Sequence, residues 1–208
     1  APSGLPLVPY QLAGVTAQLR YDSTDNLLDP RRGIRAMGSV TPSFAFAEST
    51  AFLPLRLTAS TYIDFSGSGR TILALRGALG SLLNAQAETV PPSQRFYAGG
   101  GGSVRGYDYQ SIGPRDARGK PSGGASLLEG SVELRQRFGS SYGAVVFMDA
   151  GAVGTSAGAP TDEVRVGAGV GARYYTPIGP IRADVAVPLV RQPGSGSFGF
   201  YIGIGHAF

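Results

Sequence analysis

The sequence predicts an all-β protein, an antiparallel transmembrane β-barrel, and three observations carry this prediction. Segments of about ten residues or more alternate between apolar and polar side chains, which is the length and period of a tilted membrane strand. The connections between these segments alternate between short and long, as they do in outer-membrane barrels. The polar side of the segments carries charged residues among glycines and serines, whereas the other side is apolar.

A soluble β-sandwich is the alternative that also explains the alternation. Its strands average about five or six residues, and its apolar faces would pack on a shared interior while the arginines faced water. The segments of this chain are longer, and no run of about 18 uncharged apolar residues offers a membrane helix instead. We therefore prefer the membrane barrel.

Nine strand-like segments are expected in order, at about 11–22, 31–42, 52–65, 70–82, 125–138, 142–152, 164–176, 180–189 and 197–208. In 125–138, Glu133 and Arg135 fall on one side, while Val132 and Leu134 fall on the other. A period of two places these sets on opposite faces of a strand. We expect the apolar set to meet lipid and the charged set to line a polar interior.

The connections suggest a particular orientation. Those at 66–69, 139–141 and 177–179 are short, whereas 83–124 and 153–163 are long. Short turns on the periplasmic side and long loops outside is the outer-membrane layout. Nine strands would leave the two chain ends on opposite sides, whereas a complete bacterial barrel has an even number. Either the first segment is not a full spanning strand, or these strands are part of a larger barrel.

The composition argues against several function classes. The 208 residues include no cysteine and one histidine, His206, so thiolate or histidine-rich metal sites are not expected. The basic residues are scattered, which argues against nucleic acid as a partner. No nucleophile and base can be paired, so we expect a non-enzyme without a cofactor or metal. Acidic and amide side chains at Asp22, Asp25, Asn26 and Asp29 lack calcium-loop spacing and are expected to satisfy turn backbones.

The long connection carries a run of four glycines, 99–102, followed by Val104-Arg105-Gly106-Tyr107. The lysine of a phosphate-binding loop and the spacing of a dinucleotide fold are both missing. A loop of roughly 40 residues is uncommon unless it has a function. Arginine presents a planar fork suited to carboxylates. The residues alone leave two alternatives open, a loop arginine paired with a carboxylate inside the barrel and a solvated one.

The segment 96–107, FYAGGGGSVRGY, resembles the signature loop of the BamA/TamA superfamily, also called the bacterial surface antigen D15 family. Further motifs of that family are matched in order by 21–33, 126–135, 147–151, 179–188 and 200–208. The string SVRGYDYQSIGPRD is closest to the TamA branch.

The resemblance implies a sixteen-stranded barrel preceded by POTRA domains, of which residues 1–208 would be the C-terminal part of the barrel, without a POTRA domain. The loop at about 83–124 would enter the lumen, where Arg105 would pair with Glu133 or Asp149. Glu133 could instead pair with a neighbouring arginine. The signature-loop residues are Gly99, Gly100, Val104, Arg105, Gly106 and Tyr107.

The resemblance also makes the last strand a weak seam, a lateral gate for client strands. Tyr201, Gly203, Gly205 and Phe208 match its terminal signal, and glycines in a strand weaken its packing. His206 takes a position that is usually apolar, and alternation groups it with Phe208 on the lipid face.

The function implied is insertion of client β-barrel or autotransporter proteins into the bacterial outer membrane by strand templating. The expected partners are the lipid bilayer, the clients and a TamB-like inner-membrane protein that would bind missing periplasmic domains. A two-partner-secretion-type transporter or a passive pore is the alternative, and a purely structural half-barrel is a third possibility.

Overall fold

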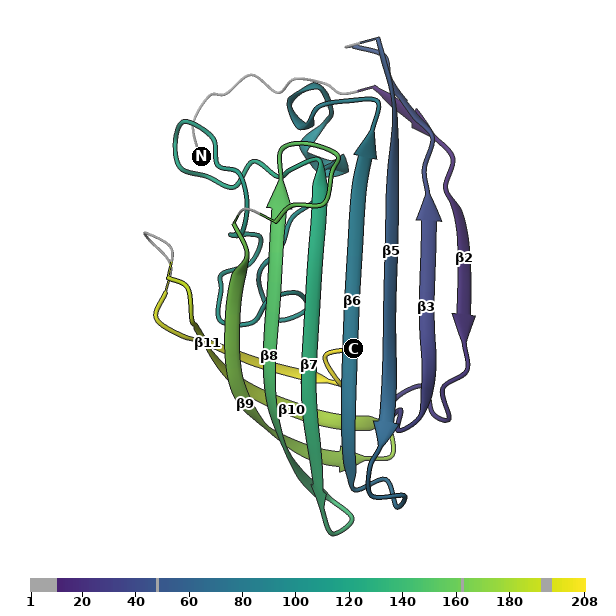
Figure 1. Cartoon of the computed structure of the whole chain (residues 1–208), viewed down its shortest axis with the longest axis vertical. Helices are drawn as coiled ribbons and strands as arrows, with labels where there is room; N and C mark the ends of the chain where they lie inside the picture. Colours follow the sequence, from purple (N-terminus) through teal and green to yellow (C-terminus); the bar gives the residue numbers. More distant parts are fainter. Residues whose placement is uncertain (1–10, 48, 162, 192–195) are drawn as a thin grey trace.

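A computed structural model describes residues 11–47, 49–161, 163–191 and 196–208, so the first ten residues of the expected domain lie outside the described part. The described strands form one antiparallel meander (Figure 1). They are β1 (Leu12–Gly14), β2 (Ala17–Asp22), β3 (Gly33–Val40), β4 (Ser43–Ala45), β5 (Thr50–Asp64), β6 (Thr71–Leu83), β7 (Ser126–Phe138), β8 (Tyr142–Gly154), β9 (Arg165–Thr176), β10 (Gly179–Pro188) and β11 (Gly199–Ile204). Two short 3-10 helices, η1 (Ala87–Thr89) and η2 (Pro92–Gln94), lie in the long loop. Among the described residues, no helix has the length and apolar character to cross a membrane.

The prediction of an all-β antiparallel fold is confirmed. At the start of the chain, the observed strands differ from the first two expected segments. The segment 11–22 divides into β1 and β2, and 31–42 becomes β3, with the short β4 following it. Pro42 lies between β3 and β4 and has no backbone N–H to donate, so the hydrogen-bond ladder cannot continue through it. Its carbonyl instead accepts from Val15 N at 3.2 Å, between β1 and β2.

The two faces of the sheet differ as the alternation predicts. The convex face exposes large apolar side chains along every long strand, with Leu19 80% and Ile202 71% exposed. The concave face carries the buried charged residues, among them Arg135, Asp149 and Asp184. A soluble sheet would bury its apolar face, so this exposed apolar surface argues against the sandwich alternative.

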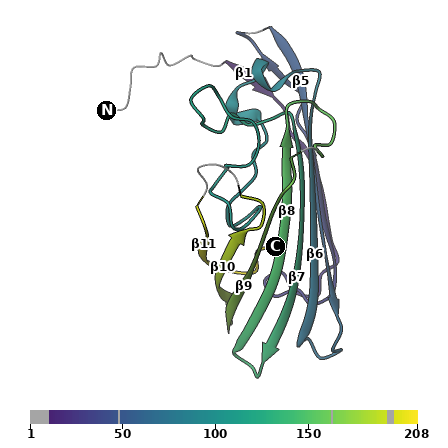
Figure 2. The ribbon, with the colours of Figure 1, turned by 60° about the vertical axis from the view of Figure 1, so that its left-hand side comes forward.

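The long loop between β6 and β7, residues 84–125, folds back onto the concave face (Figure 2). Its apolar residues Val90, Phe96, Val104 and Ile112 are buried in a cluster with side chains of the sheet, including Leu127. The loop is thus a packed element whose position is fixed by its own hydrophobic core.

The described sheet is curved but open. β2 pairs only with β3, and β11 pairs only with β10, so each is an edge within the part of the chain that the structure describes. β9, β10 and β11 curl around the loop, whereas β2 to β8 form the taller wall (Figures 1 and 2).

The turn between β2 and β3 is held by its own side chains, as expected for this acidic stretch. Asp25 Oδ1 accepts from the backbone N of Arg31 at 2.9 Å, and Asn26 Oδ1 accepts from the backbone N of Leu28 at 2.8 Å. The Asn26 contact is of the Asx type, and both contacts stabilise the turn by satisfying backbone amides.

The end of the chain corrects one prediction. The last strand stops at Ile204 instead of running to Phe208, because Gly205 adopts a φ of +89° that leaves extended geometry. The strand alternation is lost there, and His206 and Phe208 lie on the concave side. The expectation that both face lipid is therefore wrong.

Candidate functional site

The tip of the long loop carries an arginine that is enclosed by the concave face. Arg105 is 1% exposed, and its guanidinium binds Asp149 of β8 through both carboxylate oxygens. Nε donates to Oδ2 at 2.7 Å and Nη2 donates to Oδ1 at 3.0 Å. The backbone N of Arg105 also donates to Oδ2, at 3.1 Å. This is the two-pronged geometry in which arginine binds a carboxylate most strongly.

The same guanidinium reaches two further strands. Nη1 donates to Glu133 Oε1 of β7 at 2.7 Å and to Asp184 Oδ2 of β10 at 3.2 Å. The guanidinium carbon lies 3.4 Å from the centroid of the Phe147 ring, which adds a cation–π contact. One loop side chain therefore joins β7, β8 and β10.

The structure brings Arg105 together with both carboxylates that the sequence suggested as partners, Glu133 and Asp149. Glu133 also accepts from the neighbouring Arg135 Nε at 2.9 Å, so the two alternatives for Glu133 occur at once. Asp184 was missed as a partner. Its inward position is readable from the alternation of 180–189, but that pattern does not say which inward acid lies beside the loop.

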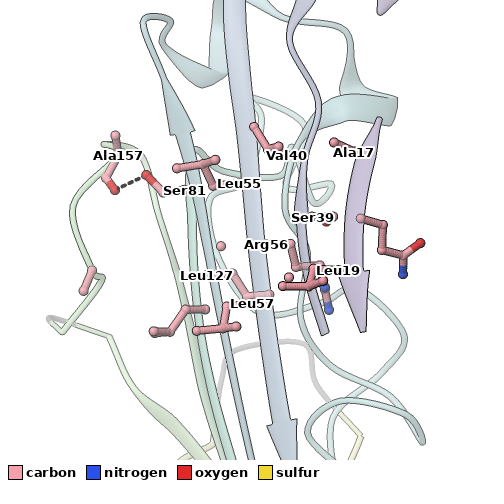
Figure 3. A pocket seen from close by; sticks show the side chains of 15 residues that line it. Ala17, Leu19, Ser39, Val40, Leu55, Arg56, Leu57, Ser81, Leu127 and Ala157 are labelled. Atoms are coloured by element: carbon pink, nitrogen blue, oxygen red, sulfur yellow. Dashed lines mark hydrogen bonds between the residues drawn. The ribbon is translucent and has the colours of Figure 1, made fainter. Parts of the chain in front are cut away.

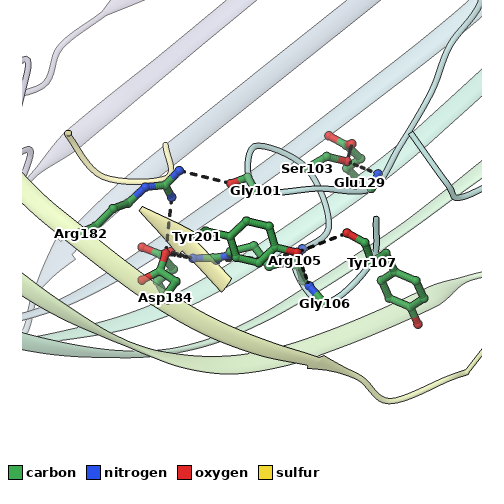
Figure 4. A network of polar contacts seen from close by, with 12 residues as sticks. Gly101, Ser103, Arg105, Gly106, Tyr107, Glu129, Arg182, Asp184 and Tyr201 are labelled. Carbon is green, nitrogen blue, oxygen red and sulfur yellow. Dashed lines mark hydrogen bonds and ion pairs between the residues drawn. The ribbon is translucent and has the colours of Figure 1, made fainter. Parts of the chain in front are cut away.

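More arginines surround these acids than the acids can neutralise. Arg173 donates to Asp184 Oδ1, and Arg182 Nη1 lies 3.5 Å from Asp184 Oδ2 (Figure 4). With Arg105 and Arg135, four guanidinium groups thus meet three carboxylates, Glu133, Asp149 and Asp184. A buried ion network of this kind depends on every member, because removing one partner leaves another charge uncompensated.

Two glycines allow the loop to approach the wall closely. Gly106 has a φ of +96°, and a Cβ there would lie 2.8 Å from the carbonyl carbon of Val187 in β10. Gly167 of β9 lies so close to the loop that a Cβ would be 1.9 Å from the Arg105 carbonyl oxygen. A side chain at either position would displace the loop.

The glycines before the arginine shape the turn that presents it. The backbone N of Gly99 donates to Ser103 Oγ at 2.9 Å, and the backbone N of Gly100 donates to the carbonyl of Val104 at 3.2 Å. Ser103 Oγ in turn contacts the carboxylate of Glu129, which also pairs with Arg76 Nη2 at 2.8 Å (Figure 4). The loop is thus tied to β6 and β7 on one side of Arg105.

Two tyrosines tie the other side of the loop to the last strands. Tyr201 Oη of β11 accepts from the backbone N of Gly106 at 2.9 Å and donates to the carbonyl of Tyr107 at 3.2 Å (Figure 4). Tyr107 Oη lies 2.6 Å from the carbonyl of Val190 and 3.0 Å from that of Val166. The loop therefore contacts every strand from β6 to β11.

A second cluster lies at the short-turn end of the concave face. Asp29, from the β2–β3 turn, contacts His206 Nε2 at 3.0 Å and Arg137 Nη1 at 3.2 Å. Arg135 Nη2 donates to the carbonyl of Phe208 at 3.1 Å. These contacts join the turn next to one edge of the sheet to the tail that follows the other edge.

The protonation of this second cluster follows from its burial. Burial, reinforced by the charge of Arg135, lowers the pKa of His206 to about 4, although Asp29 opposes the shift. For Asp29, burial alone would raise the carboxyl pKa, but the contact with His206 and the charges of Arg31 and Arg137 lower it. At neutral pH a neutral imidazole therefore donates from Nε2 to the Asp29 carboxylate.

Of the four residues proposed for the terminal strand, two lie in β11 and two lie beyond its end. Tyr201 and Gly203 belong to β11, whereas Gly205 and Phe208 follow it. Phe208 packs near Tyr62, Ile72 and Ala74 instead of extending the edge. Only the first two residues thus lie on the exposed edge strand.

No group of three or more histidine, cysteine, aspartate or glutamate side chains that could hold a metal ion is found in the described ranges. The acids near the loop are held by arginines, and those of the β2–β3 turn hold backbone amides, Arg137 and His206. The arrangement is suited to fixing a loop inside a curved sheet.

Comparison with known proteins places this arrangement in context. A family model for the Omp85 superfamily domain matches residues 8–208. Among solved structures, the fold is similar to that of BamA from Haemophilus ducreyi lacking POTRA domains 1–3, with a TM-score of 0.74 and 23% identity. It is also similar to CdiB from Acinetobacter baumannii, with a TM-score of 0.58 and 16% identity. The matches cover 90% and 93% of this chain but only 41% and 33% of those two chains.

Proposed function

Because the chain belongs to the Omp85 superfamily, we propose that it forms part of an outer-membrane barrel that inserts client β-strands, with β11 as the templating edge. The observation that carries the proposal is the edge itself, since the described part of the chain gives β11 only one neighbour, β10. Unpaired backbone groups are costly in lipid, so such an edge recruits another strand. β11 has 6 residues whereas β10 has 10, which makes it a short and replaceable partner.

The proposed membrane position rests on the convex face. Its exposed side chains are apolar along the middle of the strands, and aromatic residues lie near the short turns. Tyr142 and Tyr174, for example, pack there with ring centroids 5.4 Å apart and ring planes tilted by 53°. An apolar band with an aromatic girdle is the outer surface of a membrane barrel.

The docked loop would hold the seam in a defined shape. Among the described residues its hydrogen bonds to β11 come from Tyr201, whereas it binds β7, β8 and β10 through the ion network of Arg105. We infer that the loop stiffens the wall as far as β10 and leaves β11 free to exchange partners. This arrangement supports a gate at β11 in preference to one elsewhere in the described sheet.

We further propose that the parent protein belongs to the TamA branch, that the chain is the C-terminal half of its barrel, and that it acts on autotransporters with a TamB-like partner. The support is the match of the loop string SVRGYDYQSIGPRD to that branch. The chain spans less than half of each of the two solved structures, and the family resemblance implies POTRA domains upstream of Ala1. The upstream reading frame tests this directly.

A second function, secretion or conduction through the lumen, is supported by the surplus of guanidinium groups on the concave face. Arg173 Nε and Nη2 and Arg135 Nη1 are buried without a hydrogen-bond partner among the described residues. Such groups would attract anions or a passing polypeptide. The docked loop, however, occupies the same concave space, so we rank this function second.

Cysteine cross-linking separates the two functions. Because residues 1–208 contain no cysteine, Ile202→Cys on β11 would be unique among them, and Val146→Cys on β8 is a matched control with both neighbours paired; any cysteine elsewhere in the gene product is first replaced by serine. In proteoliposomes that contain the complete gene product, a client with one cysteine in its terminal strand should form a disulfide with Ile202→Cys only. Anion conductance in planar bilayers without any such cross-link would favour the pore instead.

A further inference from the structure

A groove of about 640 Å³ crosses the convex face over β2, β3, β5 and β6, in the half nearest the long loops (Figure 3). Strand register explains why it is hollow. Leu19, Gly38, Leu57 and Leu79 stand opposite one another on successive strands, so a row of leucines is interrupted by a glycine. A Cβ at Gly38 would meet only one side-chain atom, Leu57 Cδ1 at 3.9 Å, which means that the space above the glycine is open.

The upper rim of the groove is formed by the loop between β8 and β9. Ser81 Oγ of β6 donates to the carbonyl of Ala157 at 2.8 Å, which fixes this loop across the outer face of β7 (Figure 3). Ala157 and Ala159 then line the groove beside Leu55. The hollow is therefore a built feature with a floor, leucine walls and a fixed rim, and not merely a gap between neighbouring side chains.

The chemistry of the groove selects its occupant. The groove lies over the faces of β2, β3, β5 and β6. β3, β5 and β6 are paired on both sides, and β2, whose outer side is unpaired in the described sheet, contributes its face to the groove. The charged and polar residues Gln18, Ser39 and Arg56 stand at alternate positions, whose side chains belong to the concave side. The occupant that fits this surface is therefore a flexible apolar ligand that needs no hydrogen bonds.

We propose that this groove binds one acyl chain of a membrane lipid. The inference rests on the proposed membrane position, because the groove is continuous with the exposed apolar face that would meet the bilayer. The occupant is drawn from that bilayer and differs from bulk lipid in being held beneath the Ala157 rim. A second copy of the chain seated on the same face is the competing occupant.

Filling the groove tests the proposal. Gly38→Leu adds a side chain where the backbone accepts one and the space is open. Gly130→Leu is the matched control, since Gly130 of β7 lies two residues from the exposed Val132 and a Cβ there would meet nothing within 4 Å. Ala17→Leu, at the other end of the groove, is a second filling variant in case Gly38→Leu fails to fold.

The measurement is native mass spectrometry of the full chain, extracted from membranes in mild detergent and titrated with dioleoyl phosphatidylethanolamine. Wild type and Gly130→Leu should retain one lipid, and the groove-filling variants should bind it at least about tenfold more weakly, as expected when roughly two methylene groups lose their burial. Equal retention by all variants overturns the proposal, as does a dimer that Gly38→Leu abolishes. If the chain is absent from the membrane fraction, both the lipid-binding inference and the proposed function are contradicted. If the chain is in the membrane but retains no lipid, only the proposal that the groove binds an acyl chain is contradicted.

Discussion

Arg105 and Asp149 are joined by three hydrogen bonds, two from the guanidinium and one from the arginine's own backbone N. The side-chain bonds orient the guanidinium, and the backbone bond fixes where the loop lies relative to β8. Because both constraints converge on one carboxylate, the loop cannot shift along the wall without breaking them together. This pair is therefore the reference point for the behaviour of the whole loop.

Replacement of Arg105 should release the loop. Arg105→Ala leaves the carboxylate of Asp149 without its arginine and leaves Glu133 with Arg135 alone, and removal of one partner of a buried pair costs about 3–5 kcal/mol. Arg105→Lys keeps the charge but loses the planar fork, so its effect should be intermediate. Amide hydrogen exchange of residues 99–112 should accelerate in the order wild type, Lys, Ala. Unchanged exchange in Arg105→Ala would show that the apolar cluster alone holds the loop.

A side chain at Gly167 should undock the same loop from the opposite direction. In Gly167→Ala the new Cβ would stand where the Arg105 carbonyl oxygen lies, so the loop must move away from β9. Gly130→Ala, which meets open space, is the control. We expect faster amide hydrogen exchange at residues 104–107 in Gly167→Ala and an unchanged exchange rate in Gly130→Ala. Equal protection in both variants would contradict the close approach described.

Loss of one hydroxyl should loosen the edge strand. In Tyr201→Phe the backbone N–H of Gly106 loses its acceptor, and an unsatisfied buried group costs about 1–3 kcal/mol. Exchange of β11 amides should rise while that of β8 stays unchanged. Tyr174→Phe on the exposed face should leave β11 as it is in wild type. If client insertion depends on a mobile β11, Tyr201→Phe should also insert clients faster.

Acid should free the tail that follows β11. The pKa of His206 is about 4 when the tail is tucked and about 6.5 when it is released, so only the released form takes up a proton between these values. The tucked form therefore loses stability as the pH falls through this window, by up to about 3 kcal/mol. A fluorine label on Phe208 should report increasing motion from pH 7 to pH 4.

The matched variant for the acid response is His206→Gln, which can still donate to Asp29 but does not titrate near neutrality. Its tail should stay tucked down to the pH at which Asp29, whose own pKa is lowered, takes up a proton. A wild-type tail that is equally mobile at pH 7 and pH 4 would argue against His206 as the titrating group.

The strands were readable from the sequence because the alternation that defines them is local. From β5 to β10 the expected and observed boundaries differ by at most about two residues, since side chains of opposite polarity mark each face. The interruptions were not readable. Pro42 separates β3 from β4, and Gly205 follows the end of β11. Only the backbone geometry shows which proline and which glycine interrupt a strand.

The site was readable in part. Alternation placed Glu133 and Asp149 on the inner wall, and the family resemblance implied that Arg105 would pair with one of them, whereas the residues alone left a solvated arginine open. Asp184 was on the same face but could not be singled out, because the curvature that brings β10 beside β8 across the loop is not encoded in a period of two. The inward position of His206 could not be predicted because it depends on the positive φ of Gly205, which also ends β11.

The position of the loop within the chain imposes an order on biogenesis. Residues 84–125 are translated before β8, β9, β10 and β11, yet many of their contacts lie on those later strands. Before β8 and β10 have joined the sheet, the guanidinium of Arg105 lacks two of its three carboxylate partners, Asp149 and Asp184, so we expect the loop to be accessible to proteases. A polypeptide truncated before β8 would lack both of these acids, and we expect its loop to stay undocked.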